Sequence, residues 1–166
     1  MKSRYFSEDI REFLFLLHRY EVKYVIVGGE AVIYHGYARV TGDLDIFYEV
    51  TDENVQRLFE ALLEFWRGDI PGIKGPDEFK EEMVIQFGVP PNRFDLIGSI
   101  DGVTFQEAWG NRVIEQIHWR KKRITVCYIG LDELIRNKEA MRRPRDIEDL
   151  KYLREAKKKD RGRSRR

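Results

Sequence analysis

The stretch KYVIVGGEAVIYHGYARVTGDLDIFYEV, residues 23–50, decides the fold. Residues 23–29 are rich in β-branched and aromatic side chains and close with two glycines, which predicts a buried strand that ends in a tight turn. A short helix from Glu30 to about His35 is expected next, and Gly36 is of the residue type that commonly ends a helix. Residues 43–49 form an alternating apolar run and predict a second strand. The stretch therefore predicts a strand, a glycine turn, a short helix and a strand in succession.

Helical and strand patterns also alternate through the rest of the chain. Ser7 and Thr51 are N-cap residue types followed by apolar residues at helical spacing, which predicts helices that end near Tyr20 and Trp66. Residues 67–76 are rich in Gly and Pro and predict a loop. Further strands are predicted at residues 83–88, 93–100, 112–119 and 123–129, and further helices near 104–110, 131–141 and 145–156. This order predicts an α/β (α+β) fold in which a mixed sheet carries helices packed mainly on one face.

The size and composition of the chain are those of one globular domain. It has 166 residues, of which 42% are apolar and 36% are charged, so it can bury a core without disulfide bonds. We expect a single domain over residues 1–156. Residues 157–166, KKKDRGRSRR, contain no apolar residue and are predicted to form a basic, disordered tail.

Several classes of protein are excluded by composition. The net charge of +1 argues against a protein that coats nucleic acid with its whole surface. Cys127 is the sole cysteine, lies in a predicted buried strand and is expected to serve packing, so neither an internal disulfide nor a zinc cluster built on cysteines is expected. Because no apolar run approaches the ~18 residues of a membrane span, and the N-terminus lacks the apolar region of a signal peptide, we expect a cytoplasmic protein with no membrane partner.

Three carboxylates are the candidate metal ligands. Asp43 and Asp45 are two residues apart at the start of a predicted strand, so both side chains point to the same face. Asp95 lies within the apolar run of a later strand, where an unpaired charge is costly. If the two strands are neighbours, the three acids converge and can hold two Mg²⁺ ions about 3.5–4 Å apart, the arrangement used in phosphoryl and nucleotidyl transfer. The alternatives are a solvated strand start for the first two acids and, for Asp95, a salt bridge with Arg93.

The glycine pair Gly28-Gly29 is a candidate phosphate site. A strand that turns through glycine into a helix leaves backbone N–H groups unshielded, and phosphate oxygens can approach them closely. The segment matches neither G-x-G-x-x-G nor G-x-x-x-x-G-K-[ST], which argues against a Rossmann fold and a P-loop. A glycine pair after a strand is also common as a plain turn.

These features together resemble a known superfamily. The pattern V-G-G-x-A-x-x-x-H-G-x-x-R-x-T-x-D-L-D at residues 27–45, with Asp95 on a later strand, resembles the polymerase-β-like nucleotidyltransferases. The match is closest to the small prokaryotic branch related to abortive-infection (toxin–antitoxin) and antibiotic nucleotidyltransferases. A further stretch, LIRNKEAMRRPRDIEDL at residues 134–150, resembles the Lys-x-x-Ala and Arg-x-x-Asp-x-x-Asp helix pair of that branch.

The resemblance implies roles for individual residues. Asp43 and Asp45 would bind both of two Mg²⁺ ions, with Mn²⁺ as the alternative ion, and Asp95 would bind the catalytic one and lie nearest the acceptor hydroxyl. The residues implied in binding the phosphates of the NTP are Gly28, Gly29, Arg39, Thr41 and Lys138. Many superfamily members carry Ser where Gly29 stands here, and Glu30 after it is expected to point away from the phosphates. His35 also matches the branch, but the expected role is that of a hydrogen-bonded core residue.

The function implied is metal-dependent transfer of a nucleoside monophosphate from an NTP to a hydroxyl of RNA (such as tRNA), a protein or a small molecule, with release of pyrophosphate. The alternative is a toxin–antitoxin component, or a non-catalytic nucleotide- or RNA-binding protein on the same fold. The basic segment 157–166 favours an RNA or acidic-protein partner, and Arg142, Arg143 and Arg145 are candidate nucleic-acid contacts. A third hypothesis is a glycosyltransferase whose Asp-x-Asp holds a metal and a nucleotide sugar, although the chain is short for that fold.

Overall fold

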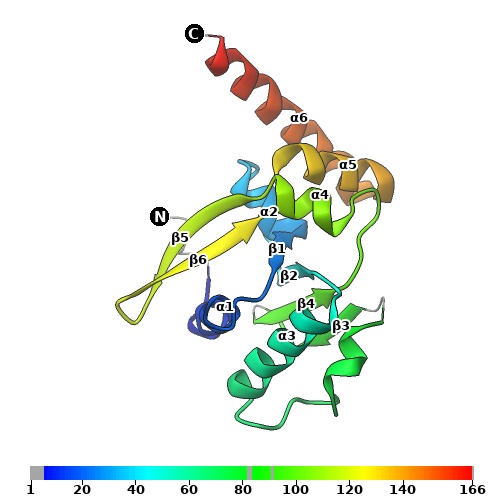
Figure 1. The fold of residues 1–166 in the computed structure, drawn as a ribbon. Helices are drawn as coiled ribbons and strands as arrows, with labels where there is room; N and C mark the ends of the chain where they lie inside the picture. The colour runs from blue at the N-terminus through cyan, green and yellow to red at the C-terminus, as the bar shows by residue number, and fades with distance from the viewer. Residues whose placement is uncertain (1–5, 82–83, 91, 166) are drawn as a thin grey trace.

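The computed structural model describes residues 6–81, 84–90 and 92–165. Its centre is a six-stranded sheet in the order β3-β4-β2-β1-β6-β5 (Figure 1). β1 is parallel to β6 and β2 is parallel to β4, whereas the other neighbours are antiparallel, so the sheet is mixed. The strands are β1 (Tyr24–Val27), β2 (Asp43–Tyr48), β3 (Val84–Phe87), β4 (Arg93–Ile97), β5 (Val113–Trp119) and β6 (Lys122–Tyr128).

The described residues form six α-helices and one short 3₁₀ helix. They are α1 (Glu8–Arg19), α2 (Gly28–Tyr34), α3 (Asp52–Phe65), η2 (Pro76–Phe79), α4 (Phe105–Gly110), α5 (Leu131–Met141) and α6 (Pro144–Ser164). The predicted N-caps are present, because the Ser7 and Thr51 side chains accept hydrogen bonds from the backbone N–H groups of Ile10 and Asn54. The predicted α+β class with a mixed sheet is confirmed. Helix α2 begins at Gly28 rather than at the predicted Glu30.

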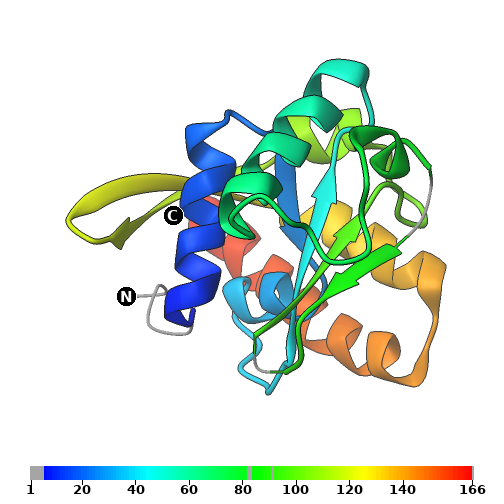
Figure 2. The same ribbon diagram turned by 90° about the horizontal axis from the view of Figure 1, so that it is seen from below.

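Helices cover both faces of the sheet, and four of the six α-helices in the described residues pack on the same face. α1 and α3 lie on one face, and α2, α4, α5 and α6 pack on the other (Figures 1 and 2). The reason is visible in β1, where all four residues are buried and successive side chains enter opposite cores. A central strand that is apolar throughout needs cover on both of its faces.

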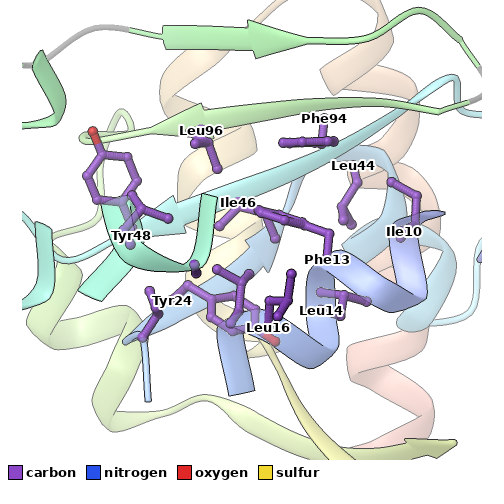
Figure 3. Packing of buried hydrophobic residues seen from close by; sticks show 14 of the residues in the cluster. Ile10, Phe13, Leu14, Leu16, Tyr24, Leu44, Ile46, Tyr48, Phe94 and Leu96 are labelled. Atoms are coloured by element: carbon purple, nitrogen blue, oxygen red, sulfur yellow. The ribbon is translucent and has the colours of Figure 1, made fainter. Parts of the chain in front are cut away.

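The core between the sheet and α1 is built from large side chains that are fully enclosed (Figure 3). Phe13 of α1 is 0% exposed and stacks on Phe94 of β4 with ring centroids 4.3 Å apart. Each such side chain contributes about 1.5–3 kcal/mol through burial. This layer fixes β4 against α1 and thereby holds the position of Asp95, one residue further along the strand.

The predicted disordered tail over residues 157–166 is corrected by α6, which continues to Ser164. Lys, Arg and Ala favour the helix, and the buried Leu150 and Leu153 anchor its first half against the body. Lys157 also forms an ion pair with Asp132 at the start of α5, with N and O 2.8 Å apart. Beyond this contact the helix extends away from the body (Figure 1). Residue 166 lies outside the described residues. No helix in the described part of the chain is both long enough and apolar enough to cross a membrane.

Candidate active site

Three carboxylates meet near the start of two neighbouring parallel strands. β2 and β4 pair so that Asp45 lies beside Asp95 and Asp43 beside Arg93. The condition stated from the sequence, that the two strands are neighbours, is therefore met. One carboxylate oxygen from each of the three acids lies within 4.8 Å of the others, which is close enough for them to hold a metal ion together. The cluster faces the layer of α2 and α5, the same side as Phe47 two residues along β2.

Arg93 neutralises part of this cluster. Its guanidinium donates a hydrogen bond to Asp43, and its Nε lies 3.8 Å from Oδ1 of Asp95. The predicted alternative of a salt bridge between Arg93 and Asp95 is thus present only at long range, alongside the convergence of the acids. Gln86 Nε2 lies 3.4 Å from Oδ2 of Asp95, whereas Oδ1 of Asp95 is buried without a hydrogen-bond partner. A buried carboxylate oxygen without a partner is costly unless a cation approaches it.

The electrostatics of the cluster indicate a shortage of positive charge. Burial, followed by the negative charges of Asp95 and Asp43, raises the pKa of Asp45 to about 7. Burial also raises the pKa of Asp95, although Arg93 opposes the change. Two acids that share a site cannot both ionise at low cost. Without a metal ion, the pair therefore retains a proton at a pH at which isolated carboxylates are fully ionised.

The glycine pair packs directly against the acids and against the segment that precedes them. Gly28 has a φ of +64°, and a Cβ at this residue would lie 2.0 Å from Oδ2 of Asp45. A Cβ at Gly29 would lie 2.6 Å from Oγ1 of Thr41 and 3.2 Å from Nη2 of Arg39. Glycine is therefore required at the first position by both backbone and space. At the second position, the hydroxyl of Thr41 lies where a side chain of residue 29 would be.

Lys138 is the centre of a buried ion network that lines the same cavity as the three acids and the glycine pair. Its Nζ lies 3.0 Å from Oδ1 of Asp146 and 3.2 Å from Oδ2 of Asp149, and its side chain is 3% exposed. Asp149 also accepts two hydrogen bonds from Arg39, at 2.9 and 3.2 Å. Asp146 accepts hydrogen bonds from the backbone and side chain of Arg143, at the start of α6. Lys138 is thus a buried structural bridge between α5 and α6.

These contacts stabilise the ionised form of Asp146. Burial would raise its pKa, but the hydrogen bonds from Arg143 and Lys138 outweigh burial and lower the pKa to about 2. The network also ties the segment of Arg39 and Thr41 to α6, although Arg39 and Asp149 are 110 residues apart in the chain. Asp149 of α6 therefore holds the Arg39 guanidinium next to the glycine pair.

All the predicted site residues line one cavity of about 430 Å³. This group consists of Gly28, Gly29, Arg39, Thr41, Asp43, Asp45, Asp95 and Lys138. The cavity wall also contains Gln86, Arg93 and Asn137, to which the sequence reasoning gave no binding role, and Arg143 and Arg145, which it considered only for nucleic acid. Gln86 could have been found from strand parity, because its register partner on β4 is Asp95.

Glu30 and His35, on and just after helix α2, lie beside this site. His35 forms a hydrogen-bonding contact of 2.8 Å between Nε2 and the carbonyl of Ile129, as expected of a core histidine. Glu30 is half-buried and is not among the residues that line the cavity, consistent with a side chain that avoids the phosphate position. Burial raises the pKa of Glu30 to about 7, although Arg39 opposes the change.

A mixed sheet that brings three carboxylates to a glycine corner is the arrangement of a nucleotidyltransferase. A sequence model of a family described as "nucleotidyltransferase of unknown function (DUF6036)" matches residues 6–157. The chain belongs to this family, and the resemblance inferred from the motifs is confirmed at that level. A search of curated proteins found no match.

Proposed function

We propose that the protein transfers a nucleoside monophosphate from an NTP to a hydroxyl group of an acceptor and releases pyrophosphate. The observation that carries this proposal is the convergence of Asp43, Asp45 and Asp95 within 4.8 Å of one another, beside Gly28. Membership of a nucleotidyltransferase family supports the general class of reaction.

The acid cluster fits a divalent cation. Oδ1 of Asp95 is buried without a hydrogen-bond partner, and burial together with like charge raises the pKa of Asp45 to about 7. Carboxylate oxygens are the ligands that Mg²⁺ prefers. Asp43 and Asp45 would hold two Mg²⁺ ions, with Mn²⁺ as the alternative ion, and Asp95 would hold one of them. When bound, the ions would supply positive charge that stabilises the attacking and leaving oxygens.

The other residues of the cavity would bind and orient the substrates. The backbone N–H groups of the first helical turn have no partner within a helix, so Gly28 and Gly29 are available to phosphate oxygens. Arg39 and Thr41 stand beside Gly29 and would fix the phosphate from the other side. Asp95 would lie nearest the acceptor hydroxyl. The protein would therefore act through position and charge, without a covalent intermediate.

Lys138 has a different part in this proposal from the one implied by the sequence. Its charge is shared between two carboxylates at 3.0 and 3.2 Å, which leaves little of it for a triphosphate. We assign it to holding Asp149, and through Asp149 to holding Arg39, against the glycine pair. Its remaining positive field lowers the pKa of Asp45 and so favours the ionised, ion-binding form.

The proposal is tested with each labelled NTP, Mg²⁺ and total RNA or cell extract, by asking which molecule becomes labelled. Asp45→Asn is expected to reduce labelling by at least about 10²-fold, since it removes a ligand of the ions that stabilise the transition state. Asp69→Asn is the matched control, because Asp69 is exposed and lies outside the cavity. Labelling that persists unchanged in Asp45→Asn overturns the proposal.

A second candidate function is nucleotide or RNA binding without catalysis, or one half of a toxin–antitoxin pair. The basic second half of α6 extends away from the body, and its Lys and Arg side chains beyond Lys157 are exposed, which favours a phosphate-rich or acidic partner. Calorimetry with NTP and Mg²⁺ discriminates the two, because a transferase must bind the metal and nucleotide together. Absence of that binding, combined with capture of RNA or a protein partner, favours the second candidate.

A further inference from the structure

Arg93 is the first residue of β4 and reaches two of the three acids in the candidate active site. Its Nη2 donates a hydrogen bond to Oδ2 of Asp43, and its Nε lies 3.8 Å from Oδ1 of Asp95. The strand register explains this reach, because Arg93 is the partner of Asp43 on β2 and precedes Asp95 by two residues on the same face of the sheet. A single guanidinium therefore spans the two carboxylates.

The contact between Arg93 and Asp95 is incomplete. Nε of Arg93 is a buried donor without a hydrogen-bond partner, and Oδ1 of Asp95 is a buried acceptor without one. The 3.8 Å between these two atoms is beyond the range of a hydrogen bond. Because an unsatisfied buried group is costly, the hydrogen bond to Asp43 holds the guanidinium where it leaves Asp95 in need of a better partner.

An ion bound at this oxygen of Asp95 needs the place that the guanidinium takes. Mg²⁺ binds a carboxylate oxygen at about 2.0–2.1 Å. Oδ1 of Asp95 is buried, so an ion can reach it only from a side that a neighbouring group vacates. On the side of Arg93, an ion at bonding distance would lie well inside the 3.8 Å that separates Oδ1 from Nε. The ion and the guanidinium therefore exclude one another at this oxygen.

The side chain of Arg93 can leave this place without disturbing the core. It is 32% exposed, so rotation towards solvent is open to it. The backbone of β4 stays fixed, because the next residue, Phe94, stacks on Phe13 in the core with ring centroids 4.3 Å apart. A divalent ion also brings two positive charges where the guanidinium brings one, and so compensates three carboxylates better.

We infer that Arg93 competes with the ion that Asp95 would hold, so that this ion binds only when the guanidinium moves away. The inference rests on the proposed function, in which Asp43 and Asp45 hold two ions and Asp95 holds one of them. The other ion escapes the competition, because Arg93 contacts one oxygen of Asp43 and leaves the second oxygen available. The two ions therefore bind in order, and Arg93 is a positioning residue that provides positive charge until the second one arrives.

The experiment counts Mn²⁺ ions bound to the nucleotide-free full chain, through the electron paramagnetic resonance signal that Mn²⁺ loses on binding. The wild type is expected to bind one ion, and a second at least about tenfold more weakly. Arg93→Gln is expected to strengthen the second ion by about tenfold or more, because it removes a like charge about 4 Å away. Arg93→Lys keeps the charge but not the fork that reaches two carboxylates, and is expected to lie between the two. Arg136→Gln is the control, since Arg136 pairs with Glu107 and neither residue lines the cavity.

Melting temperatures test the same competition in a second way. Arg93→Gln should lower the melting temperature in EDTA, because the acids lose their near positive charge. The loss should be smaller in saturating Mg²⁺, where bound ions supply that charge. An arginine with a purely structural role would give the same loss in both conditions. Adding Asp95→Asn to Arg93→Gln should abolish the gain in Mn²⁺ binding, which assigns that gain to the ion held by Asp95.

The inference is overturned if Arg93→Gln leaves the second Mn²⁺ unchanged or weakens it, or if its loss of melting temperature is equal in EDTA and in Mg²⁺. Either result leaves the proposed transfer standing. Stronger Mn²⁺ binding in Arg93→Gln supports the inference even if no molecule becomes labelled, in which case the proposed transfer fails alone. Absence of Mn²⁺ binding in the wild type and the variants overturns both.

Discussion

Two groups of buried charges line the same cavity, and they are compensated very differently. In the network around Lys138, each carboxylate contacts two cationic side chains, and the pKa of Asp146 falls to about 2 even though burial alone would raise it. In the cluster of Asp43, Asp45 and Asp95, the Arg93 guanidinium provides the near positive charge, and burial and like charge raise the pKa of Asp45 to about 7. The two groups therefore line the same cavity, but positive and negative charges balance in the first, whereas negative charge exceeds positive charge in the second.

The difference distinguishes the residues that stabilise the cavity wall from those that are proposed to bind ions in it. The paired network links α5, α6 and the segment at Arg39, and its charges satisfy one another, so it requires nothing further. The acid cluster retains a carboxylate oxygen of Asp95 that is buried without a hydrogen bond and has only the Arg93 guanidinium at 3.8 Å. Perturbed titratable groups of this second kind are typical of functional sites, whereas fully paired networks are more often structural.

The largest effect is expected on breaking the paired network. Lys138→Gln leaves Asp146 and Asp149 buried with less positive charge, and removal of one partner of a buried pair costs about 3–5 kcal/mol. Urea unfolding should show this loss, and the transferase activity should fall with it. Lys151→Gln, on the exposed side of α6, is the control and should change stability by less than about 0.5 kcal/mol. Unchanged stability with lost activity would instead mean that Lys138 acts on the substrate.

A smaller effect, confined to the acid cluster, is expected from Gly28→Ala. The positive φ of 64° adds strain of about 1–2 kcal/mol, and the new Cβ also collides with Oδ2 of Asp45. Gly72→Ala is a close control, because Gly72 has a φ of +73° but nothing within 4 Å of its Cβ position. Gly28→Ala should lose more stability than Gly72→Ala, because the control has the backbone strain without the collision, and Gly28→Ala alone should lose Mg²⁺ binding measured by calorimetry. Equal Mg²⁺ binding in the two would show that Asp45 is not part of the ion site.

Local patterns in the sequence were sufficient for the elements and for the acids. Strand parity placed Asp43 and Asp45 on one face, and the apolar run around Asp95 indicated that this carboxylate needs a partner that compensates its charge, because both inferences depend on short-range rules. The register that brings Asp95 beside Asp45 was left as a condition, since it is set by packing of the whole sheet.

Contacts between distant residues were not predictable in this way. The pairing of Arg39 with Asp149 depends on how α6 is placed, and neither residue carries a local signal for the other. Lys138 was expected to reach the triphosphate for the same reason. Its two buried partners, Asp146 and Asp149, lie on α6, and they come close to Lys138 on α5 only because of how the two helices pack.

The smallest effect, a shift of thermal stability with pH, tests the contrast between the two groups directly. Asp146 has a folded pKa of about 2 against an ordinary 3.8, so it stabilises the fold above the higher value, and that contribution is lost as pH falls through the lower one. Asp45 has the opposite sign: its folded pKa of about 7 exceeds 3.8, so its ionisation costs stability increasingly as pH rises between those values. In EDTA, the melting temperature should therefore fall by a few degrees on both sides of an acidic maximum. Asp45→Asn should reduce the loss on the high-pH side without abolishing it, because burial also raises the pKa of Glu30 to about 7, and it should leave the low-pH side unchanged. Mg²⁺ should stabilise the wild type more above pH 7 than below it, because its ligands must be ionised. A melting temperature in EDTA that does not fall with rising pH, or that Asp45→Asn does not alter, contradicts the view that the acid cluster lacks positive charge.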